Sequence, residues 1–250
     1  MKISSKDLLR YSKQIILKQI GILGQKKIAS TKVLIVGMGG LGCPVALYLC
    51  NLGIENIGIA DNDKIEFSNL NRQILFNTTD VGKPKVVQAK KRLQKINKKI
   101  QINTYKVKII KKNIKSILDK YDIICDCSDN FITRYLLNDF CLKNKKILIS
   151  AAISKFEAHV FNFNFSKDIP CYRCFMPEIP KEEKKCDTDG ILPTVAGIAG
   201  TLQANEVVKS ILDKKNELVG KMIVFNTLSL NFRKIKLTKN INCIASCNKR

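Results

Sequence analysis

The chain has 250 residues, enough for one substantial α/β domain with a smaller appended part. Its net charge of +23 comes from lysines spread along the chain, with no basic block interleaved with aromatic residues, so we expect no nucleic-acid partner. A codon bias towards lysine explains the charge better, although a basic surface would also favour an acidic protein partner. Lys6, Asp7 and Arg10 interrupt the start of the chain, which argues against a secretory leader and favours the cytoplasm.

Two short helices, at 5–20 and 24–29, are expected before the first strand. Val33–Val36 is an unbroken aliphatic run, typical of a strand buried on both faces of a parallel sheet. The turn after it fits G-x-G-x-x-G with one additional glycine: Gly37, Gly39, Gly40 and Gly42. The first two glycines of the pattern allow a tight turn against a phosphate, and the third lets the next helix pack closely on the strand.

A second strand at 57–60 ends on Asp61, close to the offset of roughly twenty residues expected for a carboxylate that binds a ribose hydroxyl. This agreement between strand, helix and acid argues against a plain glycine-rich turn. The uncharged stretch 33–54 is long enough to span a membrane, but its glycines and Pro44 argue against that, and we expect no membrane association. The stretch predicts a Rossmann-like nucleotide-binding unit.

Further strands and helices follow in alternation, and the chain then ends in antiparallel strands. We expect a helix at 84–97, a helix that starts after Asp129, a helix at 193–212, and strands at 100–107, 121–127, 146–151, 157–165, 222–226 and 230–237. Gly197 and Gly200 would let another helix approach the helix at 193–212, which is compatible with a dimer. The predicted fold class is α/β: a Rossmann-like parallel sheet extended by a C-terminal antiparallel part, with N-terminal helices. We expect one domain over 1–250, made of a helical extension (1–30), the nucleotide-binding part (31–151) and a C-terminal part (152–250).

Three charged residues indicate a nucleoside triphosphate rather than a nicotinamide cofactor. Arg72 and Lys85 follow Asp61, and such cations neutralise the charge that accumulates when pyrophosphate leaves. Asp129 follows the fourth strand, at the sheet edge where ligands of doubly wound folds bind, and is a candidate Mg²⁺ ligand. Each is also a common surface charge or helix cap, and a plain N-cap for Asp129 stays open at this point.

Several longer motifs occur in a fixed order: R-Y-S-K-Q-I (10–15), V-G-M-G-G-L-G-C-P (36–44), D-N-D-K-I-E-F-S-N-L-N-R-Q (61–73), V-G-K-P-K (81–85), D-C-S-D-N-F-I-T-R-Y-L-L-N-D (126–139) and P-C-Y-R-C (170–174). Together with the closing cysteines, they resemble the ThiF/MoeB/HesA family of ubiquitin-activating-enzyme-like adenylyltransferases for sulfur-carrier proteins. The resemblance extends over nearly the whole chain.

The resemblance implies an ATP site, a catalytic set and a homodimer. The ATP-contacting residues would be Gly40 with its glycine neighbours, Asp61 and Asp63, Asn69, Arg72, Gln73 and Lys85, and Asp129 with Asn130 beside it. Within this set, Arg72, Lys85 and Asp129 would act in catalysis, with Asp129 on Mg²⁺. In the family, an N-terminal arginine reaches the ATP of the partner subunit; Lys13 stands there and lacks the bidentate fork of arginine.

The cysteines fall into three groups. Cys171-x-x-Cys174 with Cys243 and Cys247 has the spacing of a structural four-thiolate zinc site, although accidental cysteines are the alternative. Cys186 stands where some relatives carry a loop cysteine that joins covalently to the sulfur carrier; an idle thiol is the equal alternative. The others are expected to be small core residues: Cys43, Cys50, Cys125, Cys127 and Cys141. The single histidine, His159, is expected to face solvent or to have a satisfied partner rather than to be catalytic.

The sequence therefore predicts an ATP-dependent adenylyltransferase that activates the C-terminal Gly-Gly carboxylate of a ubiquitin-like sulfur carrier, for thiamin or molybdenum cofactor biosynthesis. The region 152–250 would bind the carrier, and a cysteine desulfurase or rhodanese would supply sulfur. Three alternatives stay open: a relative that activates a carboxylate on tRNA, an NAD-binding Rossmann oxidoreductase, and a non-catalytic scaffold that binds the carrier.

Overall fold

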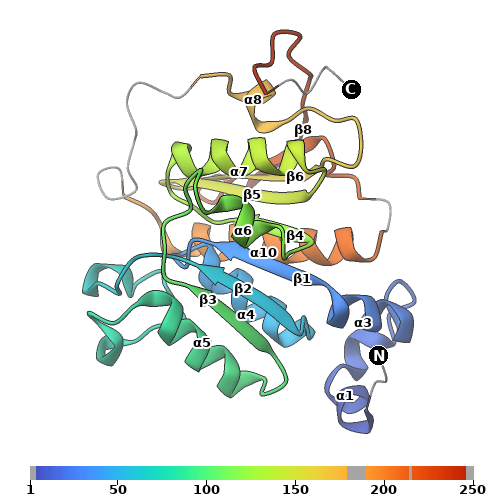
Figure 1. Ribbon diagram of the computed structural model, residues 1–250, viewed down its shortest axis with the longest axis vertical. Helices are drawn as coiled ribbons and strands as arrows, with labels where there is room; N and C mark the ends of the chain where they lie inside the picture. The colour runs from blue at the N-terminus through green and yellow to red at the C-terminus, as the bar shows by residue number, and fades with distance from the viewer. Residues whose placement is uncertain (1–3, 179–189, 214–215, 246–250) are drawn as a thin grey trace.

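The computed structural model describes residues 4–178, 190–213 and 216–245. Eight strands form one sheet in the order β3-β2-β1-β4-β5-β6-β7-β8 (Figure 1). The first five strands of this order are parallel, and β6, β7 and β8 are antiparallel, as predicted. Their bounds are β1 Lys32–Val36, β2 Asn56–Ala60, β3 Gln101–Tyr105, β4 Ile123–Asp126, β5 Ile147–Ser154, β6 Glu157–Asn164, β7 Lys221–Asn226 and β8 Asn231–Lys236.

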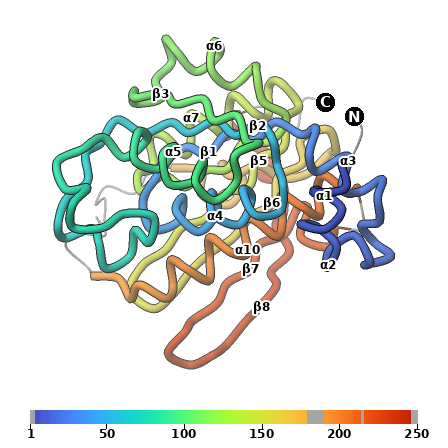
Figure 2. Tube along the Cα trace, turned by 90° about the horizontal axis from the view of Figure 1, so that it is seen from below, coloured from blue at the N-terminus to red at the C-terminus, as the bar shows by residue number. Residues whose placement is uncertain are grey.

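The helices cover both faces of the sheet (Figure 2). The sheet thus lies between two hydrophobic cores. One core joins the sheet to α3 (Gly21–Ser30), α4 (Gly42–Leu52), α5 (Lys85–Ile96) and α10 (Pro193–Ile211). The other joins it to α6 (Ile114–Leu118), α7 (Phe131–Lys143) and α8 (Tyr172–Phe175). Because both faces are covered, β1 is buried from Val33 to Val36, which explains the unbroken aliphatic run there.

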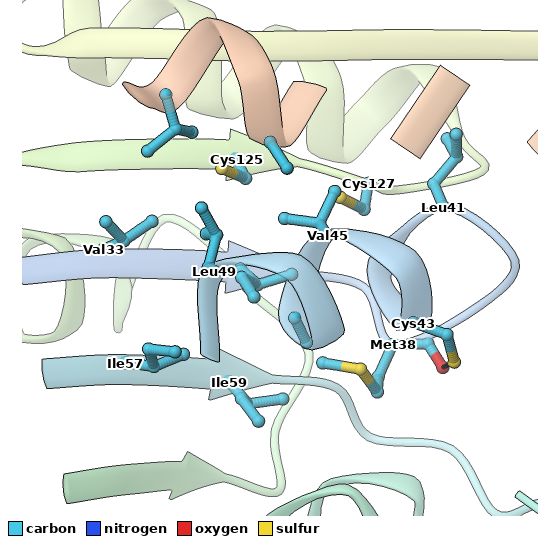
Figure 3. Close-up of a cluster of buried hydrophobic side chains, with 14 of the residues drawn as sticks. Val33, Met38, Leu41, Cys43, Val45, Leu49, Ile57, Ile59, Cys125 and Cys127 are labelled. Carbon is cyan, nitrogen blue, oxygen red and sulfur yellow. Dashed lines mark hydrogen bonds between the residues drawn. The ribbon is translucent and has the colours of Figure 1, made fainter. Parts of the chain in front are cut away.

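The glycine turn between β1 and α4 has the geometry that the sequence predicts. Gly37 has φ +93°, and a Cβ on it would collide with the backbone of Cys127. A Cβ on Gly42 would collide with the carbonyl oxygen of Gly37, so this glycine sets the tightness of the turn. The turn brings α4 onto the sheet, where Val45 and Leu49 lie among side chains from the neighbouring strands (Figure 3).

The N-terminal segment differs from the prediction of one helix at 5–20. It forms α1 (Ser5–Arg10) and α2 (Ser12–Ile15), which are separated at Tyr11. Tyr11 is buried, and its hydroxyl accepts a hydrogen bond from Asn97 Nδ2 at 3.0 Å. This contact with the chain beyond α5 fixes Tyr11 and breaks the helical pattern that the local sequence suggests.

The two glycines of α10 also differ from each other. Gly200 lies against α4, where a Cβ would come within 2.5 Å of Pro44 Cγ, whereas Gly197 has no neighbour within 4 Å. Within this chain, the predicted close helix approach is confirmed at Gly200, against α4. Within the described residues, no helix is both long and apolar enough to cross a membrane.

Candidate functional site

A cavity of about 970 Å³ opens at the carboxyl ends of β1, β2, β4 and β5. The register explains its position: Val36 at the end of β1 pairs with Ala60 of β2 and Asp126 of β4, so the segments after these strands meet. β1 and β4 flank the switch point of the sheet, where ligands bind in such folds. The cavity brings together most of the predicted site: Gly37, Gly39, Gly40, Asp61, Asp63, Asn69, Arg72, Gln73, Lys85, Asp129 and Asn130.

Asp61 holds the turns on either side of it. Its Oδ2 accepts a hydrogen bond from Met38 N at 2.7 Å, and its Oδ1 accepts one from Asp63 N at 2.7 Å. Burial raises the pKa of Asp61 above its ordinary value, while the nearby charge of Lys85 works in the other direction. Gly42, predicted to contact the ligand, is not part of the cavity wall; its role is the tight packing of the turn.

The predicted cations converge on one side of the cavity. Lys85 is buried at the start of α5, and its Nζ lies 3.1 Å from Asp63 Oδ2. Arg72 is fixed by hydrogen bonds to Ser68 O at 3.0 Å and Asn71 Oδ1 at 3.2 Å. Gln73 is 3 % exposed, and its Oε1 has no hydrogen-bond partner among the described residues. A buried amide oxygen without a partner on the wall of a polar cavity fits a site that is completed by a ligand.

Asp129 is not the N-cap of α7. That role belongs to Asn130, whose Oδ1 accepts a hydrogen bond from Thr133 N at 2.9 Å. Asp129 is exposed on the cavity wall, where its Oδ1 accepts a hydrogen bond from Asn130 Nδ2 at 3.3 Å. The helix-cap alternative is thus excluded. A carboxylate that lines the same cavity as the cations suits a hard ion such as Mg²⁺, which combines one or two carboxylates with phosphate oxygens.

A buried ionic network lies directly beneath this loop. Asp126 is fully buried and accepts hydrogen bonds from Ser128 N, Ser128 Oγ, Ser150 Oγ and Arg134 Nε at 3.0, 2.5, 2.6 and 3.0 Å. Arg134 Nη2 also donates to the carbonyl oxygens of Ser128 and Ala151. Burial works against the charged guanidinium, but the adjacent Asp126 and Tyr172 together outweigh burial and raise the pKa of Arg134. Sequence reasoning assigned no role to this network, whose members come from three elements.

Two further parts of the wall were also missed. Val107, Lys108 and Ile109, after β3, close the side next to β2. Glu157, His159 and Phe175 line the side formed by β5, β6 and α8. The first group could have been predicted from the sequence, because it follows the carboxyl end of a parallel strand. The second group comes from the antiparallel strand β6 and from α8, for which no such rule exists.

Three of the four predicted zinc ligands form a cluster. The Sγ atoms of Cys171, Cys174 and Cys243 all lie within 4.8 Å of one another, with separations of 3.9 Å for Cys171–Cys174 and 3.5 Å for Cys171–Cys243. Thiolates at 2.3 Å from a tetrahedral zinc lie about 3.8 Å apart, so the cluster fits this ion. Burial, with the neighbouring thiols, raises the pKa of Cys171 to about 12, and a bound cation would reverse this.

The remaining predicted residues divide between those the structure describes and those it does not. Cys186 and Cys247 lie outside the described residues. Lys13 is exposed on α2 and is not part of the cavity wall of its own chain. The five cysteines expected in the core are buried, and burial raises the pKa of each: Cys43, Cys50, Cys125, Cys127 and Cys141.

The strand order, the glycine turn and the cavity at the switch point define a Rossmann-type α/β protein with an antiparallel C-terminal extension. The sequence model of the ThiF family matches residues 11–245, and the chain belongs to this family. Both the fold class and the family resemblance are therefore confirmed.

Among curated proteins, the chain is 41 % identical over 247 residues to the adenylyltransferase and sulfurtransferase MOCS3 of Culex quinquefasciatus, covering 98 % of this chain and 56 % of the relative. It is 40 % identical over 247 residues to MOCS3 of Xenopus laevis, covering 98 % and 54 %. The chain thus spans about half the length of the curated relatives it matches.

Solved structures of E. coli MccB have the same fold. MccB with ATP superposes with a TM-score of 0.82 at 26 % identity, covering 94 % of this chain and 74 % of MccB. MccB with MccA-N7isoASN gives a TM-score of 0.84 at 25 % identity, covering 98 % and 75 %.

Proposed function

We propose that the protein is an ATP-dependent adenylyltransferase that activates the C-terminal glycine carboxylate of a ubiquitin-like sulfur carrier. The observation that carries the proposal is the cavity itself, in which the glycine turn, the cations Arg72 and Lys85 and the carboxylate of Asp129 line one space. The names of the MOCS3 relatives and the MccB structure with ATP support the same activity.

The nucleotide fits the part of the cavity at the ends of β1 and β2. Asp61 would bind the ribose, Val107 and Ile109 would flank the adenine, and the glycine turn would accept the phosphates at the N-terminus of α4. Arg72, Lys85, Asn69 and the buried amide of Gln73 would then surround the triphosphate. Asp129 would hold Mg²⁺, which would neutralise charge on the phosphate oxygens.

In this reaction, a carboxylate oxygen of the carrier attacks the α-phosphorus of ATP, and pyrophosphate leaves. The product is an acyl-adenylate, in which the carboxyl carbon is ready to accept sulfur. No general base is needed for this step because the attacking carboxylate is already ionised at neutral pH. Catalysis is therefore positioning plus stabilisation of the charge that develops on the leaving group, which Arg72 and Lys85 would provide.

The carrier's tail would enter from the side of β5 and β6, because the nucleotide takes the side of β1 and β2. The MOCS3 relatives favour molybdenum cofactor biosynthesis as the pathway, and the sulfur would come from a desulfurase or rhodanese type of donor. A homodimer in the cytoplasm, with Lys13 reaching the ATP of the partner subunit, is part of the same proposal.

Carrier-dependent exchange of labelled pyrophosphate into ATP tests the proposal directly. We expect exchange with a recombinant sulfur carrier that ends in Gly-Gly, and none with a carrier that lacks the last glycine. Asp129→Asn should lower the exchange rate by about 100-fold or more, because the metal ligand loses its charge. Asp119→Asn is the matched control, since Asp119 is an exposed carboxylate outside the cavity wall. Normal exchange by Asp129→Asn, or NAD binding without exchange, would contradict the proposal.

A further inference from the structure

The only histidine of the chain lies on the wall of the cavity. His159 belongs to β6, and its side chain is 30 % exposed. Its register partners are Ala152 of β5 and Val224 of β7, which carry no polar side chain. The expectation of a satisfied histidine holds, because His159 contacts Glu157, but its position within the candidate site was not anticipated.

Glu157 and two aromatic rings fix the imidazole. His159 Nε2 lies 3.1 Å from Glu157 Oε1, and both residues line the cavity. The rings of Phe161 and Phe175 meet the imidazole edge-on, with centroids 6.4 and 6.2 Å away. An ionised carboxylate can only accept, so Nε2 carries the hydrogen and the lone pair of the neutral ring is on Nδ1. A base that is oriented by a carboxylate is the arrangement found in proton-accepting catalytic sites.

His159 stands on the side of the cavity that the nucleotide leaves open. The order β2-β1-β4-β5-β6 places β6 two strands beyond β4, and thus about 10 Å from the line of Asp129. Asp61, Arg72 and Lys85, by contrast, lie towards β1, β2 and α5. A nucleotide bound at the glycine turn, with its phosphates near these cations, would leave the wall that carries His159 to the acyl group.

Adenylation needs no general base, because the attacking carboxylate is already ionised. The step that follows does need one. The acyl-adenylate is consumed by a thiol or persulfide donor R–SH, and an ordinary thiol is mostly protonated at neutral pH. We propose that His159 is the general base of this second step, oriented by Glu157. The inference rests on the proposed function, and it concerns a step that follows adenylation.

The bonds and the proton of this step balance without an oxidant or a reductant. The sulfur of R–SH forms a bond to the acyl carbon, and the bond from that carbon to the phosphate oxygen breaks. The electron pair stays on that oxygen, and AMP leaves. The thiol proton goes to His159 Nδ1 and from there to water.

Few charged groups surround the imidazole. β5 and β7 present Ala152 and Val224, and α8 presents the ring of Phe175. Arg173 of α8 is engaged with Asp139 at 2.8 Å. Glu157 is the carboxylate in contact with the ring, while Asp129 and Arg134 line the same cavity from the β4–α7 side. Glu157 is therefore the charged group in contact with the imidazole, and it orients the ring.

The test measures the two half-reactions separately in the full chain. Pyrophosphate exchange with the Gly-Gly carrier reports adenylation. Release of AMP from the preformed acyl-adenylate, after addition of dithiothreitol, reports the thiol step. The variants are His159→Gln, which removes the base, and Glu157→Gln, which removes its orienting charge. Glu217→Gln is the matched control, because Glu217 pairs with Lys234 away from the cavity wall.

For His159→Gln, we expect the ratio of AMP release to exchange to fall about 100-fold, the usual contribution of a general base. Glu157→Gln should lower the same ratio by a smaller factor, and Glu217→Gln should leave it unchanged. The remaining AMP release of His159→Gln should rise about tenfold per pH unit with the thiolate concentration, whereas the base-assisted rate of the wild type should depend less steeply on pH.

Three outcomes would overturn the assignment: an unchanged ratio, an equal fall of both rates, or identical pH profiles in the wild type and His159→Gln. Absence of exchange in the wild type would instead refute the proposed function, so the two failures are distinguishable. The single imidazole gives a further readout, because its proton NMR signals should differ between the wild type and Glu157→Gln.

Discussion

Asp126 accepts four hydrogen bonds while fully buried, and Arg134 is the cation that balances its charge. A buried ion pair is costly to desolvate and adds little net stability over an apolar core. Here, however, three of the bonds formed by the pair end on Ser128, the residue that precedes Asp129. The network thus fixes the backbone from which the candidate metal ligand projects, much as partners of metal ligands do elsewhere.

Two serine hydroxyls allow this role to be tested without leaving a charge unpaired. Ser128→Ala and Ser150→Ala each delete one hydroxyl hydrogen bond to Asp126, worth about 1 kcal/mol of stability. Only Ser128 belongs to the loop that carries Asp129. We therefore expect Ser128→Ala alone to raise the Mg²⁺ concentration for half-maximal exchange, by about tenfold. Equal Mg²⁺ requirements in the two variants would show that the network serves folding only.

Part of the candidate site was predictable from the sequence. Asp129 was predicted from its place after the fourth strand, Asp61 from its offset from the glycine turn, and Lys85 from its charge soon after Asp61; each lines the cavity. Arg134 and His159 were assigned no role there. Arg134 acts through Asp126 and Ala151, partners on two different strands. No local pattern encodes such pairings, because they exist only once the sheet has formed.

At the level of elements, α10 packs against both α4 and the glycine turn that precedes it. A Cβ on Gly200 would come within 2.5 Å of Pro44 Cγ and 2.6 Å of the carbonyl oxygen of Leu41. A Cβ on Gly40, in the turn itself, would lie 3.1 Å from the Cβ of Ala196. The position of the glycine turn is therefore restricted by α10, which lies more than 150 residues away in the sequence.

Gly200 and Gly197 form a matched pair within α10. Gly200→Ala should destabilise the protein by about 1–3 kcal/mol, because neither the Pro44 ring nor the backbone can yield without moving α4. Gly197→Ala meets no atom within 4 Å and should be neutral or stabilising by up to about 1 kcal/mol, since alanine favours a helix. Urea denaturation of both variants measures this. Equal effects would mean that α10 can shift away from α4.

Element types were predictable from the sequence, whereas boundaries and breaks were not always so. The hydrophobic periods placed β1, β2, α5 and the C-terminal hairpin within a few residues of their observed bounds. The same reasoning joined α1 to α2, because Leu8, Leu9, Ile15 and Ile16 have helical spacing. In the structure, Leu9 and Ile16 are 80 % and 73 % exposed. Their spacing thus does not report burial within this chain.

For the molecule as a whole, the cysteine cluster joins distant parts of the chain. Cys171 and Cys174 flank the start of α8, beside the cavity, and Cys243 follows β8. We expect one zinc per chain by elemental analysis. Cys171→Ser and Cys243→Ser should lose the metal and lower Tm by several degrees, because metal binding and local folding are coupled. Cys125→Ala, which removes a buried thiol elsewhere, should keep the zinc. Metal-free wild-type protein with unchanged stability would contradict the zinc prediction.

The exposed apolar residues at the N-terminus bear on the assembly. Leu9 of α1, Ile16 directly after α2 and Leu23 of α3 are 73–80 % exposed, and Lys13 lies on α2. Burial of such side chains between two copies is the usual basis of a stable dimer. A dimer formed there would carry Lys13 to a second subunit, whereas within its own chain Lys13 does not line the cavity.

Mixing two inactive variants tests whether Lys13 acts across this interface. We expect Lys13→Ala and Asp129→Asn to lose most pyrophosphate exchange separately, each lacking one charged group at the ATP. In a mixed dimer, the site of the Lys13→Ala subunit would contain its own Asp129 and the lysine of the other subunit. Random exchange of subunits makes about half of the dimers mixed. Each mixed dimer has one complete site out of two. About a quarter of the wild-type activity should therefore return. Mixing Lys13→Ala with the double variant Lys13→Ala/Asp129→Asn supplies no lysine and should restore nothing. If mixed dimers form and remain inactive, Lys13 does not act in trans.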